Sequence, residues 1–210
     1  MRLSLNNKNG YFDLHFLGGK MSRRAYLIWL IVIITGLIYW WKPSPTIENA
    51  KDHQRVSDTV QTFNGYTMTN LANYEGQFRV LSRENYRSGR EAELSPVDFA
   101  LGWGAMADPS VYKQLSIRQS NRWYYWRYEN QPPIPRHEIE THSANTHLIP
   151  ANETIAKQLA DVDQDDLIYL KGHLVEVKSA DGWMWRSSLS REDTGNGACE
   201  LMLVEEVREL

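Results

Sequence analysis

The longest uninterrupted hydrophobic run of the chain lies near its N-terminus. Residues 25–41, AYLIWLIVIITGLIYWW, contain no charged side chain. A helix of this length covers roughly 26 Å at about 1.5 Å per residue, close to the ~30 Å hydrocarbon core of a bilayer. Tyr39, Trp40 and Trp41 are typical of the aromatic belt at a membrane interface. The pattern therefore predicts a single transmembrane helix that anchors the protein in a lipid bilayer.

The charges on either side of this run predict its orientation. Residues 1–24 hold five basic residues and one acidic residue, whereas residues 42–210 hold 18 basic and 25 acidic residues. A basic flank favours the cytoplasmic side of a membrane. We therefore expect a bacterial inner-membrane protein with a cytoplasmic N-terminus and a periplasmic or extracellular C-terminal domain. Arg23 and Arg24 also resemble a twin-arginine export signal, although paired arginines are ordinary topology determinants as well.

The polar, proline-bearing residues 42–57 predict a stalk, and residues 58–210 are long enough for one soluble domain. Alternating apolar and polar positions predict a strand at 76–86, and the aromatic-rich residues 117–128 predict another. Residues 166–178 are expected to form a strand with a break at Gly172. The apolar residues 201–204 predict a strand that is covered on both faces.

Turn and capping signals complete the prediction of elements. Asp181-Gly182 and Asn196-Gly197 are hairpin-turn dipeptides. Ser95-Pro96, Asp108-Pro109 and Asn152 are typical of helix starts. The fold class expected is α+β, with a β-rich antiparallel C-terminal sheet or small barrel and a few short helices.

The amino-acid composition excludes an intramolecular disulfide and disfavours one class of partner. Cys199 is the only cysteine, so the chain has no intramolecular disulfide. The excess of seven acidic residues in 42–210 argues against nucleic acid as a partner. No cofactor is expected.

Two clusters suggest metal binding, but neither has a suitable spacing. His137, His142 and His147 are five residues apart, so neither a strand nor a helix places all three on one face. Residues 161–166, DVDQDD, begin like a calcium loop. Asp166, however, stands where that loop requires glycine, and Gly172 where it requires glutamate. We interpret them as an acidic helix-to-strand turn and expect no metal site.

The aromatic run at 123–126 is a candidate binding surface. Trp123, Tyr125 and Trp126, with Arg122 beside them, could stack on a sugar ring or hold a peptide through aromatic and cation–π contacts. Large aromatic residues in a strand also commonly form core. Because side chains alternate along a strand, Trp123 and Tyr125 should share one face while Tyr124 and Trp126 share the other.

Cys199 is a candidate nucleophile, with His147 as its base and Arg186 or Arg191 as an oxyanion partner. The order of anchor, small barrel, histidine and late cysteine distantly resembles a sortase. The sortase threonine-leucine-x-threonine-cysteine pattern is absent, and the next strand arginine, Arg208, comes nine residues later instead of at the usual short interval. The alternative interpretation is a buried thiol that acts as a small hydrophobic side chain.

Four stretches carry a closer resemblance: SPVDFALGWG at 95–104, SNRWY at 120–124, HSANTHLIP at 142–150 and SSLSREDTGNGACE at 187–200. They resemble those of a family of uncharacterised bacterial proteins with one N-terminal span. The resemblance covers most of residues 74–205 and implies a shared domain without an activity. The segment FLGGKMSRRAY at 16–26 is similar to the start of certain small bacterial inner-membrane proteins.

Two functions therefore remain open from the sequence. The favoured one is a membrane-anchored periplasmic binding or assembly module that contacts a protein, peptide or glycan partner. The alternative is a Cys–His hydrolase or transpeptidase that uses Cys199 and His147.

Overall fold

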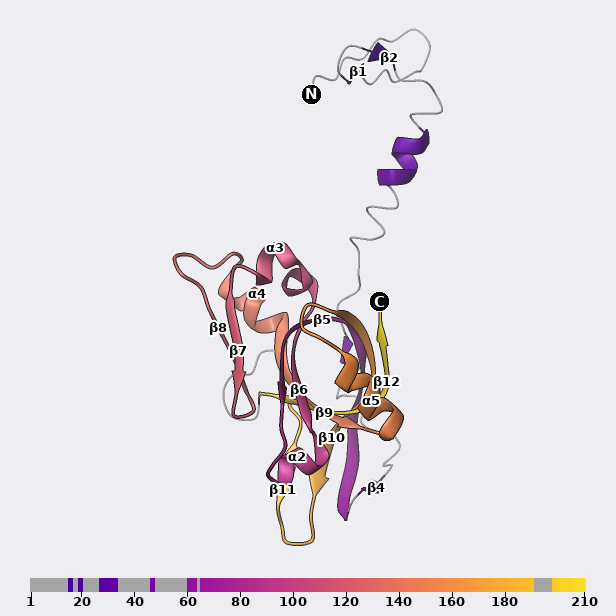
Figure 1. Ribbon diagram of the computed structural model, residues 1–210, viewed down its shortest axis with the longest axis vertical. Coiled ribbons are helices and arrows are strands. Elements are labelled where there is room, and N and C mark those ends of the chain that lie inside the picture. The colour runs from indigo at the N-terminus through magenta and orange to yellow at the C-terminus, as the bar shows by residue number, and fades with distance from the viewer. Residues whose placement is uncertain are drawn as a thin grey trace. The chain divides into compact units, whose positions relative to one another are not determined.

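The computed structural model describes residues 15–16, 19–20, 27–33, 46–47, 60–63, 65–190 and 198–210. The chain divides into two compact units, residues 1–42 and 43–210. In the first unit, β1 (His15–Phe16) pairs antiparallel with β2 (Gly19–Lys20), and residues 27–33 are helical (Figure 1).

The prediction of a transmembrane helix at 25–41 is wrong. Among the residues that the structure describes, no helix is long and apolar enough to cross a membrane. The described helix covers residues 27–33, whereas a spanning helix needs about 20 residues. The same finding contradicts the predicted single-pass location in the bacterial inner membrane. Arg23, Arg24 and the aromatic residues at 39–41 lie outside the described residues.

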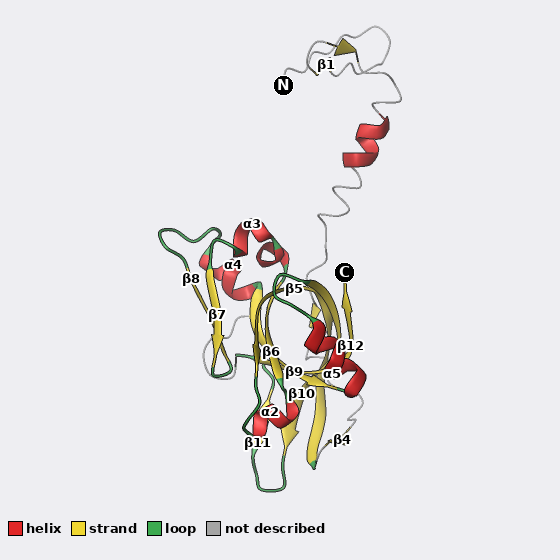
Figure 2. Ribbon diagram, in the orientation of Figure 1, coloured by secondary structure: helices red, strands yellow, loops and turns green. Residues whose placement is uncertain are grey.

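The second unit is built on five strands that close into a small barrel (Figures 1 and 2). In chain order they are β5 (Tyr66–Asn85), β6 (Val97–Gly102), β9 (Ser143–Pro150), β10 (Leu167–Lys178) and β12 (Glu200–Glu209). Neighbours around the ring are β5, β6, β9, β12 and β10, and β10 pairs with β5 again. All these pairings are antiparallel except β9 with β12, which is parallel.

The helix α5 (Glu153–Asp161) connects the third barrel strand, β9, to the fourth, β10. A five-stranded Greek-key barrel whose first strand pairs with the second and fourth, and whose third pairs with the fifth, has the connectivity of the OB-fold. The chain therefore has the strand order of this fold, with a helix between strands three and four.

Further elements are attached to this barrel. The strands β3 (Thr46–Ile47) and β4 (Val60–Phe63) pair with β5, and β11 (Met184–Arg186) pairs with β10 at the end of the sheet. The connection between β5 and β6 contains α2 (Arg90–Leu94). Residues 42–57, for which the sequence predicted a stalk, thus contain β3.

The connection between β6 and β9 is a larger insertion. It contains η2 (Gly104–Ala107), α3 (Pro109–Tyr112), β7 (Ser116–Ser120), β8 (Trp123–Arg127) and α4 (Arg136–Thr141). The strands β7 and β8 form a two-stranded sheet of their own, which stands beside the barrel in Figure 1.

Three hydrophobic clusters hold the unit together. Fully buried side chains that fill the barrel include Tyr74, Phe78, Phe99, Leu101, Leu148 and Leu170. A second cluster of buried side chains, mainly from β5, β10 and β12, packs against Trp183 and Trp185. A third cluster lies between the barrel and the insertion, where Tyr124 and Trp126 pack against it.

The β-rich α+β class is confirmed, and the small barrel is the arrangement that the structure adopts. The expected strand at 201–204 is buried on both faces, and the strand around Gly172 has a register shift between Lys171 and Gly172. The side chains of Asp108 and Asn152 cap helices as predicted, through the backbone N–H groups of Ser110 and Ile155. The sheet is mixed instead of wholly antiparallel, because β9 and β12 are parallel.

Two local predictions are wrong. Ser95-Pro96 precedes the strand β6 and not a helix, because Val97, Phe99 and Leu101 alternate into the barrel and β6 is paired on both edges. The predicted strand at 117–128 is a hairpin instead, because the chain reverses at Asn121-Arg122 between β7 and β8.

We predict that Gly172→Ala prevents the barrel from closing normally. A Cβ at residue 172 would lie 1.9 Å from the Leu203 carbonyl oxygen of the neighbouring strand. We expect a loss of about 3 kcal/mol or more in the free energy of unfolding, measured by urea denaturation. Gly182→Ala is the control, because its Cβ meets no described atom within 4 Å. Its cost should be limited to about 1–2 kcal/mol for the left-handed backbone. Equal losses in the two variants would contradict the prediction.

Candidate functional site

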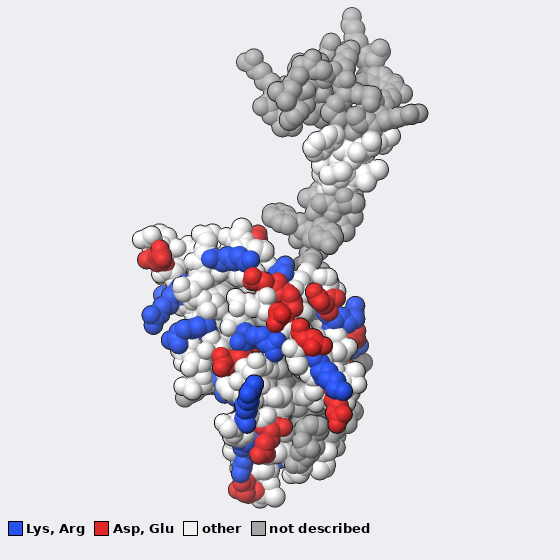
Figure 3. All heavy atoms as spheres, viewed as in Figure 1, with Lys and Arg blue, Asp and Glu red and all other residues white. Residues whose placement is uncertain are grey.

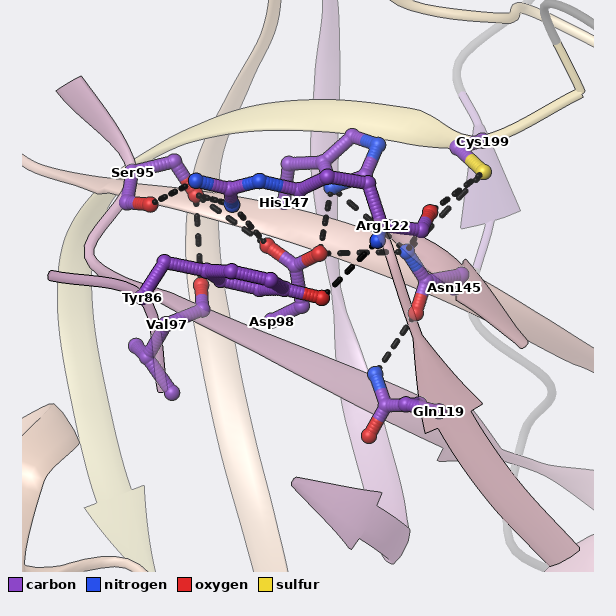
Figure 4. A network of polar contacts seen from close by, with 9 residues as sticks. All are labelled: Tyr86, Ser95, Val97, Asp98, Gln119, Arg122, Asn145, His147 and Cys199. Atoms are coloured by element: carbon purple, nitrogen blue, oxygen red, sulfur yellow. Dashed lines mark hydrogen bonds and ion pairs between the residues drawn. The ribbon is translucent and has the colours of Figure 1, made fainter. Parts of the chain in front are cut away.

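A network of polar side chains lies on the outer face of β6 and β9 (Figure 4). On β6, Val97 and Phe99 point into the barrel, so the intervening Asp98 points outward. On β9, Asn145 and His147 share the outward face, and His147 is the strand partner of Asp98. The Asp98 side chain is 0% exposed, so this carboxylate depends on its neighbours for compensation.

Arg122 supplies the opposite charge. Its Nη1 lies 2.6 Å from Asp98 Oδ1, and its Nη2 donates to the Ser95 carbonyl oxygen at 2.9 Å. Arg122 reaches the site from the turn between β7 and β8, where Asn121 has φ 53° and Arg122 has φ 67°. Two positive φ values suit a two-residue hairpin turn, but an arginine is unfavourable there compared with glycine. The ion pair offsets this local strain.

His147 holds the second oxygen of the same carboxylate. Its Nδ1 lies 2.8 Å from Asp98 Oδ2, and Asn145 Nδ2 donates to that oxygen at 3.4 Å. Because an ionised carboxylate only accepts hydrogen bonds, Nδ1 carries the proton and Nε2 is the remaining ring nitrogen. Asp98 therefore fixes both the tautomer and the orientation of His147.

Aromatic rings enclose the guanidinium of Arg122. Its Cζ lies 3.6 Å from the centre of the Tyr86 ring and 5.6 Å from that of Trp185. The Tyr86 hydroxyl accepts a hydrogen bond from the Arg122 backbone N–H at 2.9 Å. Burial, reinforced by the nearby Asp98, raises the pKa of Tyr86 to about 12. The phenol therefore stays neutral at physiological pH and adds no second negative charge.

Cys199 joins the network through Asn145. The Asn145 Nδ2 atom lies 3.9 Å from Cys199 Sγ and 3.5 Å from His147 Nδ1. The thiol also lies in donating position, 3.8 Å from the Arg122 carbonyl oxygen. Gln119 Nε2 donates to Asn145 Oδ1 at 2.6 Å and so fixes the amide. Because Nδ1 of His147 carries a proton, the Asn145 amide does not donate to it; Asn145 connects Cys199 with the Asp98–His147 pair through Asp98 Oδ2.

A row of rings continues from His147 along the same end of the barrel. Between ring centroids, the distance is 4.8 Å from His147 to Trp185, 6.1 Å from Trp185 to Trp183, and 5.8 Å from Trp183 to Tyr66. We call these four residues the ring row. Arg90 Cζ on α2 stands 5.3 Å from the centre of the Trp183 ring.

Arg90 also binds both carboxylate oxygens of Asp181, at 3.2 and 2.5 Å. This contact holds the pKa of Asp181 well below its usual range. It joins the β5–β6 connection to the turn between β10 and β11.

The structure separates the residues of the predicted aromatic surface. Arg122 belongs to the buried network, while Trp126 packs on the third cluster and stacks on Tyr128 at 6.2 Å. Trp123 is half-buried, and Tyr125 is 39% exposed with Arg118 Cζ 4.5 Å from its ring centre. Of the predicted catalytic residues, Cys199 and His147 meet in the network, and Arg191 lies outside the described residues.

The three histidines do not converge on a metal. His137 lies on α4, His142 follows that helix and His147 is bound to Asp98. Within the described part of the chain, no three histidine, cysteine, aspartate or glutamate side chains could hold a metal ion together. The acidic residues 161–166 run from the last residue of α5 to the residue before β10, as a helix-to-strand turn would.

Sequence reasoning missed Asp98, Asn145, Ser95 and Tyr86 as members of the site. A signal for Asp98 was present, because it is the only charged residue in the apolar run 97–102. A carboxylate in an otherwise buried strand usually has a buried partner. No sequence pattern pointed to the other three residues.

We predict that Arg122→Met destabilises the protein by about 3–5 kcal/mol, because it leaves the buried Asp98 carboxylate without its cation. The control is Arg118→Met in the same hairpin, where the side chain is exposed and the loss should stay below about 1 kcal/mol. The double variant Asp98→Asn/Arg122→Met should be more stable than Arg122→Met alone. Urea denaturation of the four proteins checks these differences, and similar losses for the two arginine variants would contradict them.

No protein-family model matches the chain, and neither a curated protein nor a solved structure matches it. The resemblance to single-span bacterial proteins therefore stays a prediction. Its four stretches each contribute to the network: 95–104 contains Asp98, 120–124 contains Arg122, 142–150 contains Asn145 and His147, and 187–200 contains Cys199.

Proposed function

We propose that this chain is a binding module that holds an extended segment of a protein partner along the ring row. The observation that carries the proposal is the row itself: Tyr66, Trp183, Trp185 and His147 follow one another at centroid distances of 4.8 to 6.1 Å. Tyr66 and His147 are buried and support the row, so the half-buried Trp183 and Trp185 are the members that a partner would contact. The two tryptophans pack on the second hydrophobic cluster, so their positions are fixed before a ligand arrives. Rigid aromatic side chains of this kind dominate the energetics of protein interfaces.

The position of the row supports this function. In the OB-fold, ligands bind on strands two and three and on the connections between strands one and two and strands four and five. Here these are β6, β9, the connection that contains α2, and the connection that contains β11. The ring row and the polar network lie on these elements, except for Tyr66 on β5 and for Gln119 and Arg122 in the insertion. Because one fold hosts many unrelated functions, the geometry of the ring row and not the fold carries the proposal.

An extended peptide suits this surface best. The strand β11 ends the sheet order, and a peptide can add to such an edge through its main chain. Met184 lies between the two tryptophans in the sequence, points to the opposite face of the strand and is 55% exposed. A peptide paired with β11 would place alternate side chains toward the ring row.

Nucleic acid is the less suitable ligand. Residues 42–210 carry seven more acidic than basic residues, and a polyanion needs a basic surface. On the face drawn in Figure 3, Lys and Arg alternate with Asp and Glu without a continuous basic patch.

We predict that peptides selected from a random display library bind the protein through Trp183. Trp183→Ala should weaken their binding about 10-fold or more, as for a central aromatic anchor. Tyr125→Ala is the matched control, because Tyr125 is exposed on the separate β7–β8 sheet, and should change the Kd less than about 2-fold. Isothermal titration calorimetry measures both.

A glycan array and a set of single-stranded oligonucleotides are probed in parallel. If a glycan or an oligonucleotide binds in a Trp183-dependent manner and no peptide does, the partner class is wrong. If Trp183→Ala affects no ligand, the ring row is not a binding surface.

One observation favours a second candidate, a cysteine hydrolase. The Asp98–His147 pair is oriented as in a catalytic triad, and Asn145 connects its carboxylate with Cys199. In that function the Cys199 thiol passes its proton to Nε2 of His147, and the thiolate attacks the carbonyl carbon of an ester or amide. The carbon–oxygen or carbon–nitrogen bond then breaks, the leaving alcohol or amine takes the proton from His147, and water hydrolyses the thioester. Because the amide of Asn145 lies between the two groups here, the reaction also requires this side chain to move.

Thiol alkylation distinguishes the two functions. As a binding module, the protein should react with iodoacetamide at Cys199 no faster than an unperturbed thiol of pKa about 8.5, and His147→Ala should leave the rate unchanged. A rate at pH 6 that is about 10-fold higher than that of free cysteine, and that His147→Ala abolishes, would favour the hydrolase.

A further inference from the structure

We propose that Asp98, Ser95, Tyr86 and Trp185 form a guanidinium-binding site that the chain's own Arg122 fills, and that an arginine side chain of the protein partner takes its place. The inference rests on the proposed function, because it names what the partner inserts at the end of the ring row. Trp185 belongs both to the row and to this site.

The acceptors of the site are held in place by groups other than Arg122. Asp98 Oδ2 is fixed by His147 at 2.8 Å and by Asn145 at 3.4 Å. The Ser95 hydroxyl lies in donating position to Asp98 Oδ1 at 3.3 Å and to the Val97 carbonyl oxygen at 3.2 Å. The carboxylate therefore keeps its orientation when the guanidinium leaves.

The site has the chemistry that distinguishes arginine from lysine. Two nitrogens of the guanidinium bind different acceptors, Asp98 Oδ1 at 2.6 Å and the Ser95 carbonyl oxygen at 2.9 Å. Its plane lies against the Tyr86 ring, with Cζ 3.6 Å from the ring centre. A planar cation with several donors satisfies these groups together, whereas an ammonium is a compact point charge that cannot stack in this way.

The element that delivers Arg122 is one that can be displaced. The strands β7 and β8 pair only with each other among the described strands, so the turn between them can move without breaking a strand pairing with the barrel. Its turn holds Asn121 and Arg122 at positive φ, a conformation that an arginine disfavours. The Arg122 side chain is 18% exposed, so the site reaches the surface. Arg122 thus acts as an internal competitor for the partner's arginine.

The first experiment uses Arg122→Gly, which removes the internal guanidinium and lets the turn keep its positive φ. N-ethylguanidine should raise the Tm of this variant in a saturable manner, and ethylammonium at the same concentration should not. Acetyl-arginine amide should bind the variant about 10-fold or more tightly than it binds the wild type, because no internal residue competes. The matched control is Asp98→Asn/Arg122→Gly, in which the preference for the guanidinium should be lost.

The second experiment uses the wild-type protein and decides the question even if Arg122→Gly does not fold. A peptide that contains arginine should accelerate hydrogen exchange at the backbone amides of Asn121 and Arg122, and the same peptide with lysine should not. Equal effects of arginine and lysine, or no effect of either, would overturn the inference. So would a guanidinium response that persists in Asp98→Asn/Arg122→Gly.

The outcomes also separate this inference from the proposed function. If peptides bind through Trp183 without a preference for arginine, the binding module stands and the guanidinium site is wrong. If N-ethylguanidine binds Arg122→Gly but no peptide depends on Trp183, the guanidinium site stands for the small cation and the proposed peptide partner is wrong.

Discussion

The fully buried carboxylate of Asp98 is the constraint on which the outer face of this barrel depends. A buried charge is tolerated only with a partner and satisfied hydrogen bonds. Arg122, His147 and Asn145 supply these from two other segments of the chain. The contacts that compensate this charge therefore fix the tautomer of His147, the side-chain amide of Asn145 and the position of the β7–β8 turn.

The hairpin shows how this constraint couples the insertion to the barrel. The strands β7 and β8 contribute Tyr124 and Trp126 to a hydrophobic cluster at one side, and Arg122 fastens the turn at the other. An arginine is a poor residue for this turn by its backbone preference, so its presence there is explained by the ion pair. The same contact places a cation between Tyr86 and Trp185, next to the ring row.

Local sequence signals were reliable where the decisive interaction was local. The caps at Asp108 and Asn152, the turn at Asp181-Gly182 and the register shift beside Gly172 depend on a few neighbouring residues. They were less reliable where strand pairing decides. Ser95-Pro96 has the composition of a helix start, yet pairing with β5 and β9 makes residues 97–102 a strand. The apolar residues 25–41 met a criterion of length and composition, but the described helix is shorter.

The sequence by itself indicated a β-rich α+β domain and its main strands and turns, and it named three of the residues that meet in the network: Cys199, His147 and Arg122. Hydrophobic periodicity and turn chemistry carry that information because they act over a few residues. Only the tertiary structure decided that β9 and β12 run parallel and close the barrel, and that Asp98, Arg122 and Asn145 meet on its outer face. These contacts join segments 23 to 54 residues apart, and no local pattern specifies which distant charge will compensate a buried carboxylate.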